Sequence, residues 1–306
     1  MTVTALPEPR TRRQMLTLTA AACLLPTPAL ALPKPAADPQ AALAALEKRV
    51  GGRLGVALLD TASGRCTGHR IDERFGLCST FKLPLAAVVL RQIDERRLQA
   101  DQWVPYGEAD LVAYAPVTRA QVGRGGMSVL ALAEAAQTTS DNTAANLLLG
   151  LIGGPAGLTA ALRAWGDTVT RLDRMEPQMN LVVPGDELDT TTPAAMARSA
   201  AHYLTGDALA PASRERLIAW MVATRTGQRR LRAGLPPAWR AGDKTGTAMA
   251  EGMMDKYNDV AITWPAGRAP VMISAYYETA RAHGRMRAED EAVLAQAARL
   301  VARGLA

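Results

Sequence analysis

Hydrophobic and polar residues follow a strand-like pattern near both ends of the chain and a helical pattern between them. Apolar positions over residues 41–50 recur at helical spacing, and a strand is expected at residues 54–59 with a hairpin partner at 66–71. Strand patterns return at residues 240–247, 259–264 and 271–277, followed by an amphipathic helix over residues 288–302. The helices expected in the middle lie at residues 80–97, 129–137, 143–150, 155–164, 192–204 and 211–223.

This distribution predicts an α/β (α+β) fold, in which both ends of the chain build one antiparallel sheet flanked by helices and an all-helical domain is inserted between them. Residues 32–77 and 223–306 are expected to form the α/β domain, and residues 78–222 the helical domain. With 306 residues the chain is long enough to bury a large core, and its aromatic content of 4% favours helices over an aromatic-rich β-sandwich.

Residues 1–31 have the composition of an export signal. Three arginines precede an apolar run over residues 15–25, which is too short to span a bilayer, and Ala29-Leu30-Ala31 is a small-x-small cleavage site. The segment Thr11-Arg-Arg-Gln-Met-Leu16 is similar to a twin-arginine signal, so we expect a periplasmic protein. Export by the general secretory route stays an alternative. A lipid anchor at Cys23 is disfavoured because the leucine usual three residues earlier is absent.

The charge of the chain argues against a nucleic-acid partner. Cleavage after Ala31 removes three arginines and one glutamate from a net charge of +6, which leaves +4, and the basic residues form no run. We also expect a monomer with no membrane span in the mature protein. Cys66 and Cys78 remain after cleavage; the sequence does not decide whether they pair, and Cys78 is expected to be a small buried packing residue.

Histidine is scarce and widely spaced. His69, His202 and His283 form no H-x-H or H-E-x-x-H pattern, so a metal-dependent hydrolase and a Ser-His-Asp triad both lose support. We expect neither a metal nor a cofactor.

Three short polar motifs occur in order: Ser79-Thr-Phe-Lys82, Ser140-Asp-Asn142 and Lys244-Thr-Gly246. With seven serines and five lysines among 306 residues, the set is improbable by chance. Arginine keeps its proton in a protein whereas a buried lysine can lose it, and two of the five lysines lie in these motifs. The others, among them Lys48 and Lys256, are expected on the surface.

Ser79 and Lys82 can form a nucleophile with an adjacent base. A helix that begins at Ser79 places both side chains on one face, since positions i and i+3 are neighbours. The helix dipole favours a nucleophilic hydroxyl at this end, and the backbone N–H of Ser79 can donate to an oxyanion. The structural alternative for Ser79 is an ordinary helix N-cap.

The other two motifs add polar groups that would complete a pocket. Ser140 can relay a proton and Asn142 can hold a substrate amide, whereas the aspartate between them is expected to bind local backbone amides. On a strand, Lys244 and Gly246 point to one face, and the glycine lets a ligand approach the backbone. The backbone N–H of Thr247 is a natural second oxyanion donor.

A charged loop supplies a further carboxylate. Glu176 and Asn180 stand four residues apart in a proline-containing segment and can hold one water molecule between them. The segment from Arg174 to Asp189 has the length of a compact Ω-loop, which an ion pair between these two residues would close. Beside a serine acyl-transfer site, Glu176 is expected to be the general base for hydrolytic water.

With these four motifs in order, and Leu111-Val-Ala-Tyr114 between the first two, the chain after the signal resembles a class A serine β-lactamase. The resemblance implies that Ser79 is acylated, that Lys82 helps to activate it, and that Ser140 passes a proton to the leaving nitrogen. It further implies that Asn142 holds the substrate side-chain amide, that Glu176 and Asn180 position the deacylating water, that Lys244, Thr245 and Thr247 bind the substrate carboxylate, and that Tyr114 walls the entrance. Whether Lys82 or Glu176 is the acylation base stays open.

Three departures from the family pattern affect these expectations. Met179 stands where the Ω-loop motif usually has leucine, which is a near-isosteric change. The arginine usual on the strand after Lys-Thr-Gly is absent, and Arg230 is expected to be the second cation for the substrate carboxylate. The loop over residues 247–258 looks longer than usual, and Ala248 offers Cys78 no partner, which excludes a carbapenemase-type disulfide there.

Three activities fit the short motifs to different degrees. The favoured one is hydrolysis of a small-molecule β-lactam through an acyl-enzyme. A DD-peptidase of cell-wall peptides shares the three short motifs but does not need Glu176 and Asn180. A β-lactam-sensing receptor domain that acylates without turnover requires a transmembrane anchor and no deacylating glutamate.

Overall fold

The computed structural model describes residues 1–3 and 39–305. The chain divides into two units, residues 1–35 and 36–306, and only the second is described further. Apart from its first three residues, the expected export signal lies outside the described residues, so the signal and its cleavage site stay predictions.

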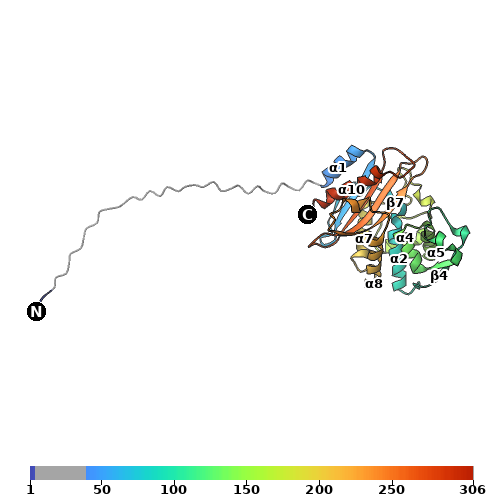
Figure 1. Cartoon of the computed structure of the whole chain (residues 1–306), viewed down its shortest axis with the longest axis horizontal. Coiled ribbons are helices and arrows are strands. Elements are labelled where there is room, and N and C mark those ends of the chain that lie inside the picture. The colour runs from blue at the N-terminus through green and yellow to red at the C-terminus, as the bar shows by residue number, and fades with distance from the viewer. Residues whose placement is uncertain (4–38, 306) are drawn as a thin grey trace. The chain divides into compact units, whose positions relative to one another are not determined.

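A five-stranded antiparallel sheet in the order β2-β1-β9-β8-β7 runs through this unit (Figure 1). The first two strands come from the N-terminal part of the sequence and the other three from the C-terminal part, so the prediction of one sheet built from both ends is confirmed. The strands are β1 (Arg53–Asp60), β2 (Cys66–His69), β7 (Arg240–Ala248), β8 (Lys256–Trp264) and β9 (Val271–Glu278).

Helices cover both faces of the sheet, because successive strand residues point to opposite sides. Val56 belongs to a core that α1 (Pro39–Val50) and α10 (Ala288–Ala302) complete, whereas its neighbour Ala57 belongs to the core on the other face. The helices of that second core are α2 (Lys82–Asp94), α4 (Val129–Thr138), α5 (Asn142–Leu151), α6 (Gly154–Ala164), α7 (Pro193–Leu204) and α8 (Pro211–Ala223).

The helix after Ser79 is buried along most of its length. Every residue from Lys82 to Leu90 is buried, so packing on all sides fixes the position of Lys82. The helix differs from the expected range of residues 80–97. It begins with a 3₁₀ turn, η1 (Cys78–Phe81), and its α-helical part ends at Asp94.

Two short strand pairs connect loops around the site. β3 (Phe75–Gly76) pairs with β6 (Thr190–Thr191), and next to this pair Leu77 N donates to the Asp189 carbonyl at 2.8 Å. The other short elements are β4 (Trp103–Pro105) with its partner β5 (Gly126–Ser128), α3 (Thr118–Gln121), α9 (Leu231–Gly234), η2 (Glu108–Asp110), η3 (Val122–Arg124) and η4 (Gln178–Asn180).

The connection between β7 and β8 is shorter than the sequence suggested. β8 begins at Lys256 rather than at residue 259, so residues 249–255 make the whole connection. Lys256, expected on the surface, is buried with 3% of its area exposed, so that expectation is wrong. The alternation of apolar residues does not indicate that β8 begins at Lys256, because the first residues of the strand carry polar side chains that bind other segments.

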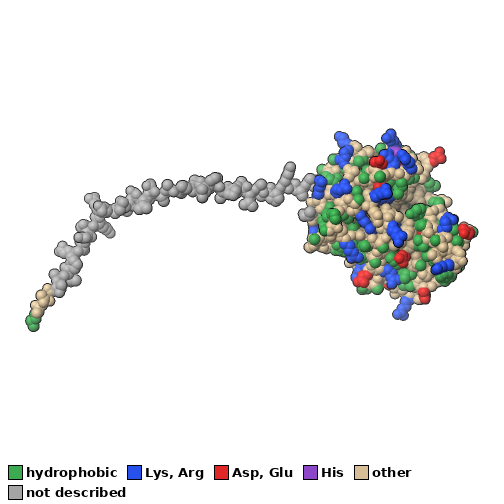
Figure 2. Space-filling view, in the orientation of Figure 1, with side chains coloured by type: hydrophobic (Ala, Val, Ile, Leu, Met, Phe, Trp, Pro, Cys, Tyr) green, Lys and Arg blue, Asp and Glu red, His purple; other side chains and the backbone are tan. Residues whose placement is uncertain are grey.

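On the face drawn in Figure 2, basic and acidic side chains are interspersed. No single helix in the described part of the chain is long and apolar enough to cross a membrane, and the bent pair of α5 and α6 reaches that length and hydropathy only jointly.

Candidate active site

Segments far apart in sequence bring the expected residues together. Ser79 lies in η1, Lys82 opens α2 and Ser140 stands two residues before α5. Lys244 lies in the middle of β7, and Glu176 lies in the Ω-loop, which we define as residues 174–189. Hydrogen bonds and ion pairs link these five residues to one another.

The Ser79 hydroxyl lies between a lysine and a carboxylate. Lys82 Nζ donates to Ser79 Oγ at 2.8 Å, and Ser79 Oγ donates to Glu176 Oε1 at 3.3 Å. Lys82 Nζ and Glu176 Oε1 are 2.9 Å apart, and neither side chain is exposed. The hydroxyl can therefore transfer its proton to either group across a single hydrogen bond, which activates a serine nucleophile.

Burial lowers the pKa of Lys82 below its ordinary value, because an ammonium loses its hydration inside the protein. The neighbouring Glu176 carboxylate raises the pKa of Lys82, because its negative charge stabilises the ammonium, but burial has the larger effect. Lys82 Nζ also donates to the Ser140 carbonyl at 3.0 Å and to the Asn142 side-chain oxygen. A lysine with a lowered pKa and a fixed position is suited to accept a proton from a serine.

Ser140 connects the nucleophile to β7. Lys244 Nζ donates to Ser140 Oγ at 3.0 Å, and Lys82 Nζ lies 3.4 Å from the same oxygen. Burial, and then the neighbouring Lys82 cation, lower the pKa of Lys244 well below its ordinary value. The Ser140 hydroxyl is thus held between two lysine side chains, an arrangement through which protons can pass.

Strand β7 runs directly beside the nucleophile. A Cβ on Gly246 would lie 3.1 Å from Ser79 N and 3.0 Å from Cys78 Cβ, so a larger residue would push the two segments apart. The expected oxyanion donors, the N–H groups of Ser79 and Thr247, therefore come from two segments in close contact.

Three residues of the site have a left-handed backbone that is unusual outside glycine. The φ angles are +44° at Cys78, +61° at Tyr114 and +62° at Ser140. Each such residue costs about 1–3 kcal/mol, which the surrounding contacts must supply, and such strain clusters at active sites. Tyr114 is 60% exposed, and its carbonyl accepts from Asn142 N at 3.0 Å, so the backbone of Tyr114 adjoins that of Asn142.

The two residues after Ser140 have different roles. Asn142 Nδ2 donates to the Ala113 carbonyl at 2.8 Å while its Oδ1 accepts from Lys82. Asp141 caps α5 by accepting from Ala144 N at 2.9 Å, which is the local backbone role expected for it. Both side chains are thereby fixed relative to the nucleophile.

An ion pair closes the ends of the Ω-loop, and a side-chain hydrogen bond connects two residues within it. Arg174 Nε lies 2.5 Å from Asp189 Oδ2, and Asp189 Oδ1 accepts from the N–H of Arg174 at 3.0 Å. Within the loop, Asn180 Nδ2 donates to Glu176 Oε2 at 2.6 Å, and the Glu176–Pro177 peptide bond is cis. The Glu176 carboxylate thus has one oxygen toward Ser79 and the other toward Asn180.

Arg230 is buried behind β7, with 1% of its area exposed. Its Nη1 donates to the carbonyls of Gly246 and Asn258 at 2.7 and 2.8 Å, and its Nε lies 3.3 Å from Glu291 Oε1. Nη2 donates to Thr247 Oγ1 at 2.6 Å. The guanidinium therefore supports the end of β7 and contacts a hydroxyl that is expected to bind substrate.

The two cysteines among the described residues, Cys66 and Cys78, are free thiols. Cys78 is fully buried, as expected for a packing residue, and burial raises the pKa of its thiol to about 12. In the described part of the chain, no group of three His, Cys, Asp or Glu side chains could hold a metal ion.

Comparison with known proteins shows the family to which the chain belongs. The model of the Beta-lactamase enzyme family matches residues 38–305. The structure of an ancestral (GNCA) class A β-lactamase is 54% identical, with a TM-score of 0.82 over 87% of this chain and 100% of that chain. The chain belongs to the class A serine β-lactamases.

Curated relatives agree with this assignment. β-Lactamase L2 of Stenotrophomonas maltophilia is 50% identical over 85% of this chain and 84% of that protein. β-Lactamase AST-1 of Nocardia asteroides is 44% identical over 98% of each. This class A β-lactamase is therefore a hydrolase of β-lactams, and the family, fold class and enzyme class predicted from the sequence are confirmed.

Motifs alone missed several residues of the β-lactamase site. Asn146 holds the backbone of Glu176 from both sides, accepting from its N–H at 2.9 Å and donating to its carbonyl at 2.8 Å. Asn258 Nδ2 donates to the Gly76 carbonyl at 2.8 Å, just before the nucleophile turn. Thr226 Oγ1 lies 2.6 Å from Thr245 Oγ1.

A compositional signal for two of these residues was available. The chain contains only four asparagines, Asn142, Asn146, Asn180 and Asn258, and all four bind segments of the site. Scarcity, which drew attention to the lysines, therefore points to Asn146 and Asn258 as well.

Proposed function

We propose that this β-lactamase works in two steps, through a Ser79 acyl-enzyme that water activated by Glu176 then hydrolyses. The observation that carries this proposal is the contact of Ser79 Oγ with both Lys82 Nζ and Glu176 Oε1, at 2.8 and 3.3 Å. A DD-peptidase or a sensor that stops at the acyl-enzyme does not need the second of these contacts.

In the acylation step, Ser79 Oγ attacks the lactam carbonyl carbon while its proton passes to Lys82 or Glu176. The N–H groups of Ser79 and Thr247 stabilise the oxyanion. The carbon–nitrogen bond then breaks, its electron pair stays on nitrogen, and the nitrogen takes a proton from Ser140 Oγ. Lys82 can resupply that proton, since its Nζ lies 3.4 Å from Ser140 Oγ.

In the deacylation step, Glu176 removes a proton from water and the resulting hydroxide attacks the ester carbonyl. Ser79 Oγ leaves as the acyl–oxygen bond breaks and takes the proton that Glu176 removed from water, which returns both groups to their starting state. Asn180 supports this step because its Nδ2 binds Glu176 while its buried Oδ1 has no protein partner and can accept from the water.

Substrate binding is assigned to groups around β7 and the loop before α5. Lys244, Thr245 and Thr247 receive the substrate carboxylate, and Arg230 is the second cation through its contact with Thr247. Asn142 holds the side-chain amide and Tyr114 forms the rim. Arg174 and Asp189 close the Ω-loop that carries Glu176.

We further propose a periplasmic monomer, exported by the twin-arginine route, that needs neither metal nor cofactor and divides into the two domains given above. Fractionation of cells that lack the twin-arginine translocase tests the route. Loss of the mature protein from the periplasm would support it, and undiminished export would assign the general secretory route.

Hydrolysis of a chromogenic cephalosporin by the purified mature protein tests the mechanism, with Ser79→Ala and Glu176→Ala measured alongside. We expect multiple turnover in the parent, no acylation in Ser79→Ala, and a stable acyl-enzyme in Glu176→Ala, detected by mass spectrometry. A single stoichiometric burst in the parent, or parental turnover in Glu176→Ala, would contradict the proposal.

A further inference from the structure

Lys256 is a buried lysine that this mechanism does not use. It is 3% exposed at the first position of β8, and its Nζ donates to the Val182 carbonyl in the Ω-loop at 2.9 Å. No carboxylate of the described residues forms an ion pair with it. A buried ammonium without a counterion is costly, so its retention calls for an explanation.

Lys256 shares a strand face with a residue that holds the nucleophile turn. Lys256 and Asn258 occupy alternate positions of β8, so their side chains point to the same side. Asn258 Nδ2 donates to the carbonyls of Gly76 and Leu77 at 2.8 and 3.2 Å, directly before η1. One face of β8 therefore contacts both the turn that carries the nucleophile and the loop that carries the general base.

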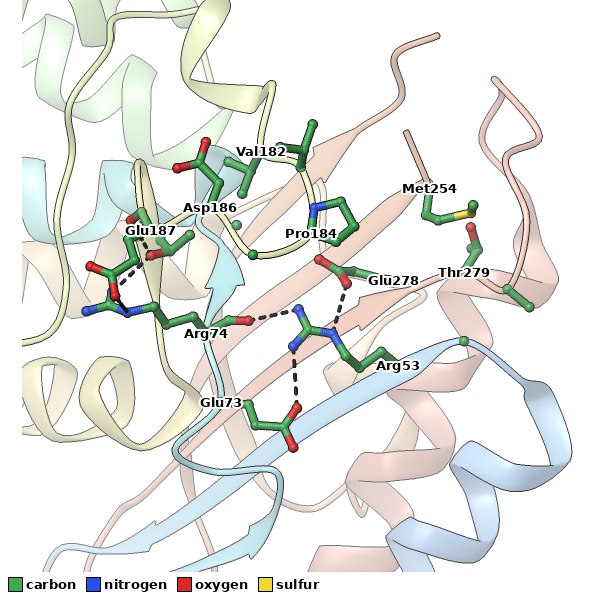
Figure 3. A pocket seen from close by; sticks show the side chains of 16 residues that line it. Arg53, Glu73, Arg74, Val182, Pro184, Asp186, Glu187, Met254, Glu278 and Thr279 are labelled. Carbon is green, nitrogen blue, oxygen red and sulfur yellow. Dashed lines mark hydrogen bonds and ion pairs between the residues drawn. The ribbon is translucent and has the colours of Figure 1, made fainter. Parts of the chain in front are cut away.

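The part of the Ω-loop that Lys256 binds lies beside a cavity of about 740 Å³ (Figure 3). Residues 182–187 line one side, and Arg53 and Glu278 line another. Arg53 is bound to Glu278 and Glu73 at 3.0 and 3.4 Å, and so it is held away from the loop. Val182 itself is buried beside Gly76, but the next residues of the loop, 183–185, are exposed and lack the close packing that fixes buried segments.

Within the described residues, the bond from Lys256 is the hydrogen bond that joins residues 182–187 to the five-stranded sheet. The other hydrogen bonds of this segment join residues nearby in the sequence, and its ion pairs, those of Glu187 with Arg74 and Arg171, are long at 3.8 and 3.9 Å. A bond from an ammonium to a carbonyl is charge-assisted and stronger than a neutral one.

We infer that Lys256 is a positioning residue for deacylation. Its ammonium fixes Val182, whose N–H donates to the Asn180 carbonyl at 3.0 Å, so the position of Asn180 follows that of Val182. Asn180 in turn binds Glu176 at 2.6 Å. Lys256 thereby sets the site of the hydrolytic water from outside the pocket. The inference rests on the proposed function and deepens it.

The test compares Lys256→Met, which keeps most of the side-chain length but removes the donor, with Lys48→Met, an exposed lysine on α1. Acylation and deacylation of a chromogenic cephalosporin are measured separately by stopped flow, and the acyl-enzyme by mass spectrometry. We expect Lys256→Met to acylate at the parental rate and to deacylate about ten- to a hundredfold more slowly. Lys48→Met should match the parent in both steps.

Thermal melting separates positioning from a structural role. Replacing a buried ammonium that has no counterion by an apolar side chain removes its desolvation cost but leaves the Val182 carbonyl without its donor, so the melting temperature should change little. If Lys256→Met slowed acylation and deacylation equally and melted at a lower temperature, the inference would be overturned. It would also be overturned if Lys256→Met deacylated at the parental rate.

If Lys256→Met does not fold, Lys256→Gln and Lys256→Arg are measured in its place. We expect Lys256→Gln to deacylate slowly and Lys256→Arg to deacylate at close to the parental rate. Equal deacylation rates in these two variants would overturn the inference. Glu176→Gln serves as the reference for the mechanism itself. If Glu176→Gln turned over at the parental rate, the proposed function would fail, whatever Lys256 does.

Discussion

Lys82 Nζ lies 2.9 Å from Glu176 Oε1, and both side chains are fully buried beside the Ser79 hydroxyl. Two proton acceptors therefore share one donor, and each neutralises part of the charge of the other. Removing either leaves a buried charge without its partner, which is strongly destabilising. The two roles can be separated only by measuring acylation and deacylation as individual steps.

Lys82→Met and Glu176→Gln should stop the reaction at different points. We expect Lys82→Met to lower the acylation rate by about a thousandfold, the range of a general base. Glu176→Gln should acylate within about tenfold of the parent and then stall, because water lacks its base. Stopped-flow measurement of the first turnover checks both. If Glu176→Gln lost acylation as severely as Lys82→Met, Glu176 would be the acylation base.

The lowered pKa of Lys244 predicts an alkaline limit to substrate binding. Its folded-state pKa lies well below 10.5, so the cation that binds the carboxylate is lost as pH rises through that lower value. We expect the KM of the parent to increase on the alkaline side while the KM of Lys244→Arg stays flat, since arginine keeps its charge. Measuring KM for both proteins from pH 6 upward tests this prediction. The same increase in KM at alkaline pH in the parent and in Lys244→Arg would contradict it.

Arg230→Ala should weaken binding of the substrate carboxylate. Loss of a charged hydrogen-bonding partner corresponds to an increase in KM of about ten- to a hundredfold. Arg229→Ala is the matched control, because the Arg229 side chain is 74% exposed and should leave KM unchanged.

A methyl ester of the same β-lactam separates charge recognition from general damage. Its KM should be insensitive to Arg230→Ala, because the ester carries no negative charge. Equal effects on acid and ester would show that Arg230 supports the strand rather than the substrate.

Much of the site could be predicted because its chemistry depends on rare residue types at fixed spacing. The Ser79 and Lys82 pair, the Ser140 motif and Lys244 each required only local sequence. The sheet could be predicted from both ends because apolar runs of strand length stand there. The site roles of these residues stay predictions until the variants above are measured.

What the sequence did not indicate depends on contacts between distant segments. Lys256 is buried because the Val182 carbonyl, 74 positions away, accepts from it, and no periodicity reports such a pairing. The helix expected to reach residue 97 ends at Asp94 instead, where the carboxylate binds Ala210 N and Ser213 Oγ. Its 3₁₀ start likewise adjoins β7, which approaches closely at Gly246.

Asp189→Asn should loosen the Ω-loop and slow deacylation. Asp189 is fully buried, and its carboxylate binds the Arg174 side chain and the backbone N–H of Asp173 and Arg174. Because the Arg174 side chain is 30% exposed, we expect a loss of about 2 kcal/mol, below the 3–5 kcal/mol typical of fully buried pairs. For a domain of this size, that lowers the melting temperature by roughly 4–8 °C.

Glu187→Gln is the control for this change. Its side chain lies in the same loop, is 64% exposed and makes ion pairs no shorter than 3.8 Å, so melting and kinetics should stay at parental values. Calorimetry together with single-turnover kinetics measures both variants. Because Glu176 acts after the acyl-enzyme forms, Asp189→Asn should change deacylation more than acylation. An unchanged melting temperature in Asp189→Asn would mean that the ion pair does not hold the loop closed.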